Sequence, residues 1–247
     1  MDITHDTLFN GALRLSQPAR GHRIGTDAVL LAAACPQGAG RIVDLGCGAG
    51  AVGLRAAQVN ADATVTLVDC DAEILALAAA NSAANRLDDR CRVVAGDVLA
   101  KGFPAADSGL KDWADAVLTN PPFAAPGRGT ISPDSRRARA HVIAGPLEAW
   151  VKAALRCLRP GGTLVMIHRA DAIGDILAAM ARRFGGVSLR FVHPRAGEPA
   201  HRVLVCARKG ARAPLVILPP LVLHGAEGRF TDEAAALHAG ISGLSPG

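Results

Sequence analysis

The chain has 247 residues, half of them hydrophobic, and carries 27 Lys and Arg against 22 Asp and Glu. This length suits one large domain, or one domain with appendages. No apolar run approaches the roughly 18 residues of a membrane span, and the amino terminus lacks the layout of an export signal, so we expect a cytoplasmic protein that is not a membrane protein.

The charged and sulfur-containing residues narrow the class further. Six cysteines are spread along the chain without a CxxC pair or a Cys/His cluster. This spacing favours neither a disulfide framework nor a metal site, and we interpret the thiols as small buried side chains in a reducing compartment. The basic residues are 23 Arg and only 4 Lys. Arginine suits contacts to phosphates and bases, which favours a nucleic-acid partner, with a coding bias toward Arg as the alternative.

The first expected helix lies in GTDAVLLAAACP, at 25–36. Thr26 or Asp27 would cap it, and it would end before Pro36. Asp27 has a second interpretation, as a contact to a residue of the binding site. We expect the whole N-terminal segment, residues 1–40, to lie over a ligand pocket.

From Arg41 onward, short β-branched runs alternate with Ala-rich stretches, which is the pattern of a parallel sheet with helices on both faces. Seven strands are expected, at 41–46, 64–69, 91–96, 114–120, 163–168, 188–194 and 201–207. The helices between them are expected at 51–60, 72–85, 145–158 and 171–184.

Only the segment RAGEPA separates the last two strands, which is too short for a helical crossover, so they should pair antiparallel. The sequence therefore predicts an α/β fold with a doubly wound, seven-stranded, mostly parallel sheet whose last strand is antiparallel. Residues 41–210 would form this domain. A C-terminal tail, 211–247, would pack on it and include a short helix that starts near Thr231.

A glycine-rich stretch, DLGCGAGAVG at 44–53, follows the first strand of the sheet. Gly46, Gly48 and Gly50 would let the backbone turn tightly and approach a ligand, toward which the next helix points its free N–H groups. The stretch also satisfies the dinucleotide fingerprint G-x-G-x-x-G/A, which keeps NAD open as a candidate.

Acidic residues at three strand ends favour S-adenosylmethionine over NAD. Asp44 directly precedes the glycines, where it would repel a pyrophosphate but attract a sulfonium and an amino group. Asp69 ends the second strand and can accept both ribose hydroxyls, and Asp97 follows the third and can accept from an adenine amine. Asp71 is interpreted as a helix N-cap. No later stretch is typical of hydride transfer.

The fourth strand ends in NPPF, Asn120 to Phe123. The side-chain oxygen of Asn120 and the carbonyl of Pro121 can each accept a hydrogen from an exocyclic amine, which localises its lone pair toward a methyl donor. The two prolines, Pro121 and Pro122, fix the direction of that carbonyl, and Phe123 offers a face on which an unstacked base can lie. The alternative is a proline turn that only closes a strand.

Together, DLGCGAG, VDCD, GDV and TNPPF resemble the class I amino-methyltransferases. Four further stretches resemble the bacterial tRNA adenine-N6 methyltransferases that modify the adenosine 3′ of the valine anticodon: RIGTDAVLLAAACP, ARAH, FVHPRAGEPAHRVLV and LVLHGAEGRFTDEAAALH. The resemblance spans about residues 7 to 239 and implies catalysis and base stacking by Asn120 to Phe123. It implies that Asp44, Gly46, Gly48, Asp69 and Asp97 hold the cofactor, to which the loop pattern adds Gly50 and the motif adds Asn120. Many relatives have Tyr in place of Phe123, and often an acidic residue near His141.

The expected substrate contacts follow the catalytic motif. The loop at 125–141 carries Arg128, Arg136, Arg137 and Arg139, which we expect to contact RNA phosphates, with a solvated charged loop as the alternative. His193 and His201 are interpreted as structural, and Arg202 as an RNA contact.

The expected substrate is the single-stranded anticodon loop of tRNA, because a small chain has no room for a domain that flips a paired DNA base. The alternatives are guanine N2 in rRNA, a glutamine of a release factor, a non-catalytic RNA-binding protein and an NAD-dependent oxidoreductase. The release-factor alternative usually carries a larger helical N-terminal domain than the 40 or so residues here.

Overall fold

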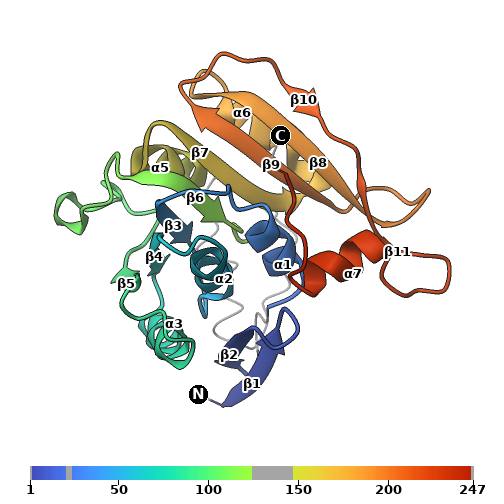
Figure 1. The fold of residues 1–247 in the computed structure, drawn as a ribbon. Coiled ribbons are helices and arrows are strands. Elements are labelled where there is room, and N and C mark those ends of the chain that lie inside the picture. The colour runs from blue at the N-terminus through green and yellow to red at the C-terminus, as the bar shows by residue number, and fades with distance from the viewer. Residues whose placement is uncertain (1, 21–23, 124–146, 246–247) are drawn as a thin grey trace.

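The computed structural model describes residues 2–20, 24–123 and 147–245. All seven expected strands form and share one sheet (Figure 1). They are β3 (Arg41–Leu45), β4 (Thr64–Asp69), β5 (Cys91–Ala95), β6 (Ala114–Thr119), β7 (Leu158–Arg169), β8 (Phe184–Arg195) and β9 (Arg202–Lys209). Their order is β8-β9-β7-β6-β3-β4-β5. The five neighbouring strands β5, β4, β3, β6 and β7 are parallel to one another. As predicted, β9 is antiparallel, and it pairs with both β7 and β8.

The helices cover both faces of the sheet and define two cores. On one face lie α1 (Thr26–Ala33), α2 (Ala51–Val59) and α3 (Ala72–Ala84), and on the other α5 (Leu147–Cys157) and α6 (Ile173–Met180). The three central strands, β4, β3 and β6, are buried on both faces, which explains their near-continuous apolar sequence. The fold is therefore the doubly wound α/β class that the sequence predicts.

The expected helix at 171–184 is shorter than predicted. A 3-10 turn occupies Ala170–Ala172, α6 ends at Met180, and Arg182 has a positive φ of 63°. Phe184, which the pattern placed at the helix end, begins β8 instead and is buried in the second core. Its burial against the sheet outweighs the local helical pattern.

The first strands of the chain form a separate hairpin that the sequence reading missed. It comprises β1 (Ile3–Leu8) and β2 (Leu13–Pro18), joined by a turn in which Asn10 and Gly11 have positive φ. Asn-Gly is a strong hairpin signal, so this turn was readable from the sequence.

Two asparagine side chains bind this hairpin to the domain: Asn81 within α3 and Asn85 at the C-cap of α3. The side-chain amide of Asn81 bonds both the N–H and the carbonyl of Ser16, and that of Asn85 does the same with Arg14. Each amide thus satisfies β2 as a neighbouring strand would. Asn81 also donates to the carbonyl of Ala49 at 2.9 Å, which ties the hairpin to the glycine loop.

The C-terminal tail extends the sheet. Both β10 (Val216–Ile217) and β11 (Leu221–His224) pair parallel with β8, giving nine strands within the described residues. The expected final helix is α7 (Asp232–His238), capped by the Thr231 hydroxyl, and it packs on α1. The placement of residues 1–40 over a ligand pocket stays a prediction. Within the described ranges, no helix has the length and apolar character to cross a membrane.

Gly53 sets how closely α2 can approach the sheet. A Cβ at Gly53 would lie 2.3 Å from a methyl carbon of Leu67, which is fully buried in β4, and 3.2 Å from Asp44. We therefore expect Gly53→Ala to lower the free energy of unfolding by about 1–3 kcal/mol, measured by urea denaturation.

Gly174 in α6 provides the matched control, because a Cβ there would have no atom within 4 Å. Gly174→Ala should leave the stability unchanged or raise it by up to about 1 kcal/mol. Equal effects of the two substitutions would show that the contact between α2 and β4 adjusts without cost.

Candidate active site

The register of the sheet brings the predicted motifs together at the carboxyl ends of the strands. Leu45 pairs with Val68 on one side and Thr119 on the other. The residues that follow these three are Gly46, Asp69 and Asn120. The glycine loop, the acidic strand end and the NPPF motif therefore meet at one edge, where the strand order reverses and ligands bind in such sheets.

The glycine loop has the backbone conformation that its sequence predicts. Gly46, Gly48 and Gly50 have φ of 73°, 53° and 92°, and Gly50 is the N-cap of α2. A Cβ on Gly46 would lie 3.0 Å from the ring of Trp150, so glycine is required there for space as well as for conformation.

The amides of this loop are largely bonded within the protein. The N–H groups of Gly46 and Cys47 donate to the carbonyl of Val68 at 2.8 and 2.9 Å, and that of Gly48 donates to Asp69 at 3.0 Å. The expectation that the start of the helix points free N–H groups at the ligand is wrong for Gly53, whose N–H donates to Asp44 at 2.8 Å. The internal bonds hold the loop in shape without a ligand.

Asp44 is a carboxyl group in an apolar setting. It is 2% exposed, and burial raises its pKa from the ordinary 3.8 to about 7, while the Gly53 amide lowers it and the negative charge of Asp69 raises it further. A cationic group beside it would bring this pKa down again, because an opposite charge favours the carboxylate. This behaviour fits the sulfonium and amino groups of S-adenosylmethionine and does not fit a pyrophosphate.

The other two acids differ in exposure. Asp69 is half-buried, and each of its oxygens accepts one backbone N–H, from Gly48 and from Asp71. A carboxylate has about four acceptor positions, so both oxygens can still accept ribose hydroxyls. Asp97 is exposed, and its Oδ1 accepts the Leu99 N–H at 2.8 Å. Asp71 caps α3 through the N–H groups of Glu73 and Ile74, as expected.

The NPPF segment begins with an unsatisfied buried oxygen. The Oδ1 atom of Asn120 is buried and has no hydrogen-bond partner among the described residues. An oxygen left in this state costs about 1–3 kcal/mol, so its retention needs an explanation such as a ligand that supplies a donor. Pro121 is buried, and Pro122 and Phe123 are half-buried.

Trp150 on α5 is a supporting residue that the sequence reading missed. Its indole Nε1 donates to the Thr119 hydroxyl at 2.6 Å, and that hydroxyl donates to the Leu45 carbonyl at 2.9 Å. Both side chains are buried. The bonds join the end of β3 to the end of β6. The only sequence signal was that the chain has just two tryptophans.

Phe123 lies against two side chains from other parts of the sheet edge. The Arg202 guanidinium carbon is 4.8 Å from the ring centroid, and the His168 ring meets it edge-on at 5.0 Å and 86°. His168, also missed, is buried at the end of β7, and burial lowers its pKa.

Arg202 was expected to contact RNA, and Asp27 either to cap α1 or to contact a residue of the binding site. The N-cap of α1 is Gly25, without a side-chain cap, so the prediction that Thr26 or Asp27 caps this helix is wrong. Asp27 instead accepts the Nε–H of Arg202 at 2.9 and 3.1 Å. The guanidinium, expected to contact RNA, is thus paired within the protein.

The remaining expected substrate residues are divided. The ring Nδ1 of His193 lies 2.7 Å from the Glu198 carbonyl, and that of His201 lies 3.1 Å from the Val192 carbonyl, in keeping with structural roles. The positions of Arg128, Arg136, Arg137, Arg139 and His141 lie outside the described residues, and their contacts stay predictions.

Burial of Asp44 makes a pH-dependent stability prediction. Between pH 3.8 and about 7 the folded state keeps a proton that the unfolded state releases, so this group's stabilisation is lost as the pH rises through that window. Asn cannot ionise and has the same shape. In the cofactor-free protein, Asp44→Asn should therefore gain stability relative to wild type between pH 5 and pH 8, measured by urea unfolding. An unchanged stability difference at the two pH values would contradict a raised pKa at Asp44.

Known proteins share both the sequence and the fold. Residues 22–190 match the family model described as methyltransferase small domain. The tRNA1(Val) (adenine(37)-N6)-methyltransferase of Porphyromonas gingivalis is 30% identical over 90% of this chain and 89% of its own. The enzyme of the same name from Dickeya chrysanthemi is 29% identical over 87% and 85%.

A solved structure from Agrobacterium tumefaciens, described as a predicted O-methyltransferase, superposes with a TM-score of 0.75 at 32% identity. The match covers 89% of this chain and 98% of that chain.

Across the described residues no group of three or more His, Cys, Asp or Glu could hold a metal ion.

The family match spans more than half of the sequence and includes the glycine loop, the acidic strand ends and NPPF. The chain therefore belongs to the methyltransferase small-domain family, whose cofactor is S-adenosylmethionine, and shares the branch of the tRNA1(Val) (adenine(37)-N6)-methyltransferases.

Proposed function

We propose that this chain methylates the exocyclic N6 of an adenine in tRNA, in the single-stranded anticodon loop at the adenosine 3′ of the valine anticodon. The reaction would take place in the cytoplasm. The observation that carries the proposal is the buried Asn120 Oδ1, which has no hydrogen-bond partner within residues 2–20, 24–123 and 147–245 and lies where the strand order of the sheet reverses. The names of the relatives that match nearly the whole chain support the choice of tRNA and adenine.

The residues of the site fit S-adenosylmethionine, which supplies the methyl group when bound. A Cβ on Gly48 would have no protein atom within 4 Å, so the space beside this glycine is open, and Asp44, Gly46, Gly48 and Gly50 would surround the methionine part. Asp69, with acceptor positions left on both oxygens, would take the ribose, and Asp97 the adenine amine.

Asn120 and Pro121 would activate the substrate amine. The lone pair of an adenine amine is delocalised into the ring, which makes the nitrogen a weak nucleophile. Oδ1 of Asn120 and the carbonyl of Pro121 would each accept one hydrogen and direct the lone pair toward the methyl group. Because β6 is fixed next to β3, this geometry exists before the substrate arrives, and the contribution is one of alignment.

The buried Asn120 oxygen, the family match and the names of the relatives count against the alternative functions. A protein that only binds RNA has no use for a buried amide oxygen that lacks a donor. Membership of a methyltransferase family sets the NAD-dependent oxidoreductase aside. Guanine N2 and a glutamine amide could both use NPPF, but the relatives from Porphyromonas gingivalis and Dickeya chrysanthemi, each matched over most of its length, carry the name of an adenine-N6 enzyme.

The first test uses labelled S-adenosylmethionine with unmodified total tRNA and with an anticodon stem-loop of valine tRNA. We expect N6-methyladenosine after digestion of either RNA. A stem-loop with purine in place of the target adenine lacks the amine and should take no label. Label in rRNA or in a release factor, with none in tRNA, would contradict the proposal.

Asn120→Ala tests the chemical role separately from cofactor binding. Loss of one preorganised acceptor should lower kcat by about 100-fold or more. The affinity for S-adenosylhomocysteine, measured by calorimetry, should change little. Near-normal turnover would show that Asn120 does not activate the amine.

A further inference from the structure

Resting on the proposed function, we infer that Arg202, anchored by Asp27, is a positioning residue that sets the plane of the Phe123 ring for stacking of the target base. Asp27, Phe123 and Arg202 are far apart in the sequence. They come from the first turn of α1, from the segment after β6 and from the first residue of β9.

The pairing of the strands places Arg202 at the catalytic edge. β9 runs antiparallel to β7, so its first residue lies beside the last residue of β7, with Arg202 opposite Arg169. The neighbouring residue of β7 is His168, whose ring lies 5.0 Å from the Phe123 ring and is nearly perpendicular to it. The ends of β6, β7 and β9 thus meet around one aromatic ring.

The guanidinium itself is fixed by the protein. Its Nε–H lies 2.9 and 3.1 Å from the two carboxylate oxygens of Asp27, and Nη1 donates to the carbonyl of His201 at 3.1 Å. The side chains of Arg202 and Asp27 are only 24% and 21% exposed. A cation held at this depth in an ion pair is unsuited to the role of a free phosphate contact.

This arrangement favours an aromatic ring in one orientation. A cation over a ring face contributes about 0.5–2 kcal/mol, and an edge-to-face ring pair about 0.5–1.5 kcal/mol. With the Arg202 guanidinium over one face of the ring, a base would stack on the opposite face of Phe123. The order of the stack would be guanidinium, phenyl ring and base. The guanidinium and the phenyl ring are in place before the base arrives, which lowers the entropy cost of binding.

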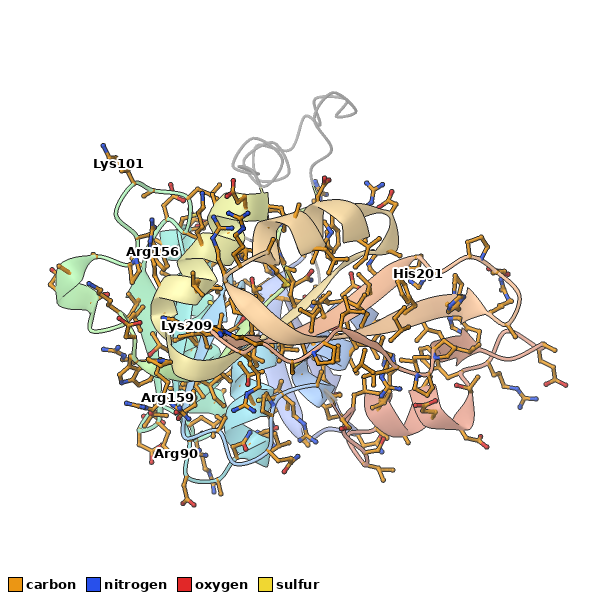
Figure 2. All side chains as sticks on the ribbon, turned by 90° about the horizontal axis from the view of Figure 1, so that it is seen from above. Arg90, Lys101, Arg156, Arg159, His201 and Lys209 are labelled. Atoms are coloured by element: carbon orange, nitrogen blue, oxygen red, sulfur yellow. The ribbon has the colours of Figure 1, made fainter. Side chains whose placement is uncertain are left out.

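Arg202→Met removes the charge and the planar group but keeps much of the volume. Arg159→Met is the matched control, because Arg159 also pairs with an aspartate, Asp115. Arg159 lies at the amino end of β7, whereas the candidate site lies at the carboxyl ends of the parallel strands. Figure 2 shows Arg159 well separated from His201, the neighbour of Arg202 in the chain.

The first readout is independent of RNA. With 4-fluorophenylalanine incorporated at the six phenylalanines, the 19F signal of Phe123 is the one that Phe123→Leu removes. Arg202→Met and Asp27→Asn should shift or broaden this signal, and Arg159→Met should not. An unchanged Phe123 signal in both variants would overturn the inference, even if the protein methylates tRNA.

The second readout is a double-mutant cycle on the methylation of the stem-loop. Arg202→Met should lower kcat/KM by about 10-fold, with an unchanged affinity for S-adenosylhomocysteine and an unchanged salt dependence of RNA binding. In a Phe123→Leu background the same change should cost less than about 2-fold, since the ring to be positioned is gone. Additive losses, or a shallower salt dependence, would assign Arg202 to the phosphates and overturn the inference. A wild-type protein without activity on tRNA would overturn the proposed function, while the 19F result would still decide the role of Arg202.

Discussion

The site depends on the hydroxyl of Thr119, which is fully buried between two strand ends. It accepts the Trp150 indole N–H and donates to the carbonyl of Leu45. Each bond contributes about 1 kcal/mol net, but leaving one of these buried groups unpaired costs about 1–3 kcal/mol, so the arrangement strongly favours a single register. Gly46 follows Leu45 and Asn120 follows Thr119. The glycine loop and Asn120, the proposed acceptor for the substrate amine, are therefore fixed relative to each other by the strands.

Around this fixed edge the protein keeps two groups in unfavourable states. The Asp44 carboxyl is buried, with its pKa raised to about 7, and Asn120 Oδ1 is buried with no hydrogen-bond partner in the described part of the chain. A cationic cofactor beside Asp44 would relieve the first, and an amine donor at Asn120 would relieve the second. Perturbed and unsatisfied groups of this kind gather at functional sites because ligands complete them. Ligand binding should accordingly stabilise the fold.

The sequence allowed the sheet and the backbone of the glycine loop to be predicted, because their signals are local. β-branched runs, glycine spacing and a capping aspartate act over a few residues, and the seven strands, the left-handed glycines and the Asp71 cap all appear as expected. The contacts that were missed are long-range. Asp27 and Arg202 are 175 residues apart in the sequence, and Trp150 and Thr119, which share a hydrogen bond, are 31 residues apart. The end of α6 was also misjudged, because burial of Phe184 in the sheet outweighed its helical pattern.

Whether Asn120 accepts a hydrogen from the substrate amine can be seen in a crystal structure with S-adenosylhomocysteine and adenosine. We expect Asn120 Oδ1 at about 2.7–3.2 Å from the adenine N6, with the base stacked on Phe123. Adenosine bound away from this edge, or an Asn120 Oδ1 bonded to the cofactor or to another protein group, would contradict it.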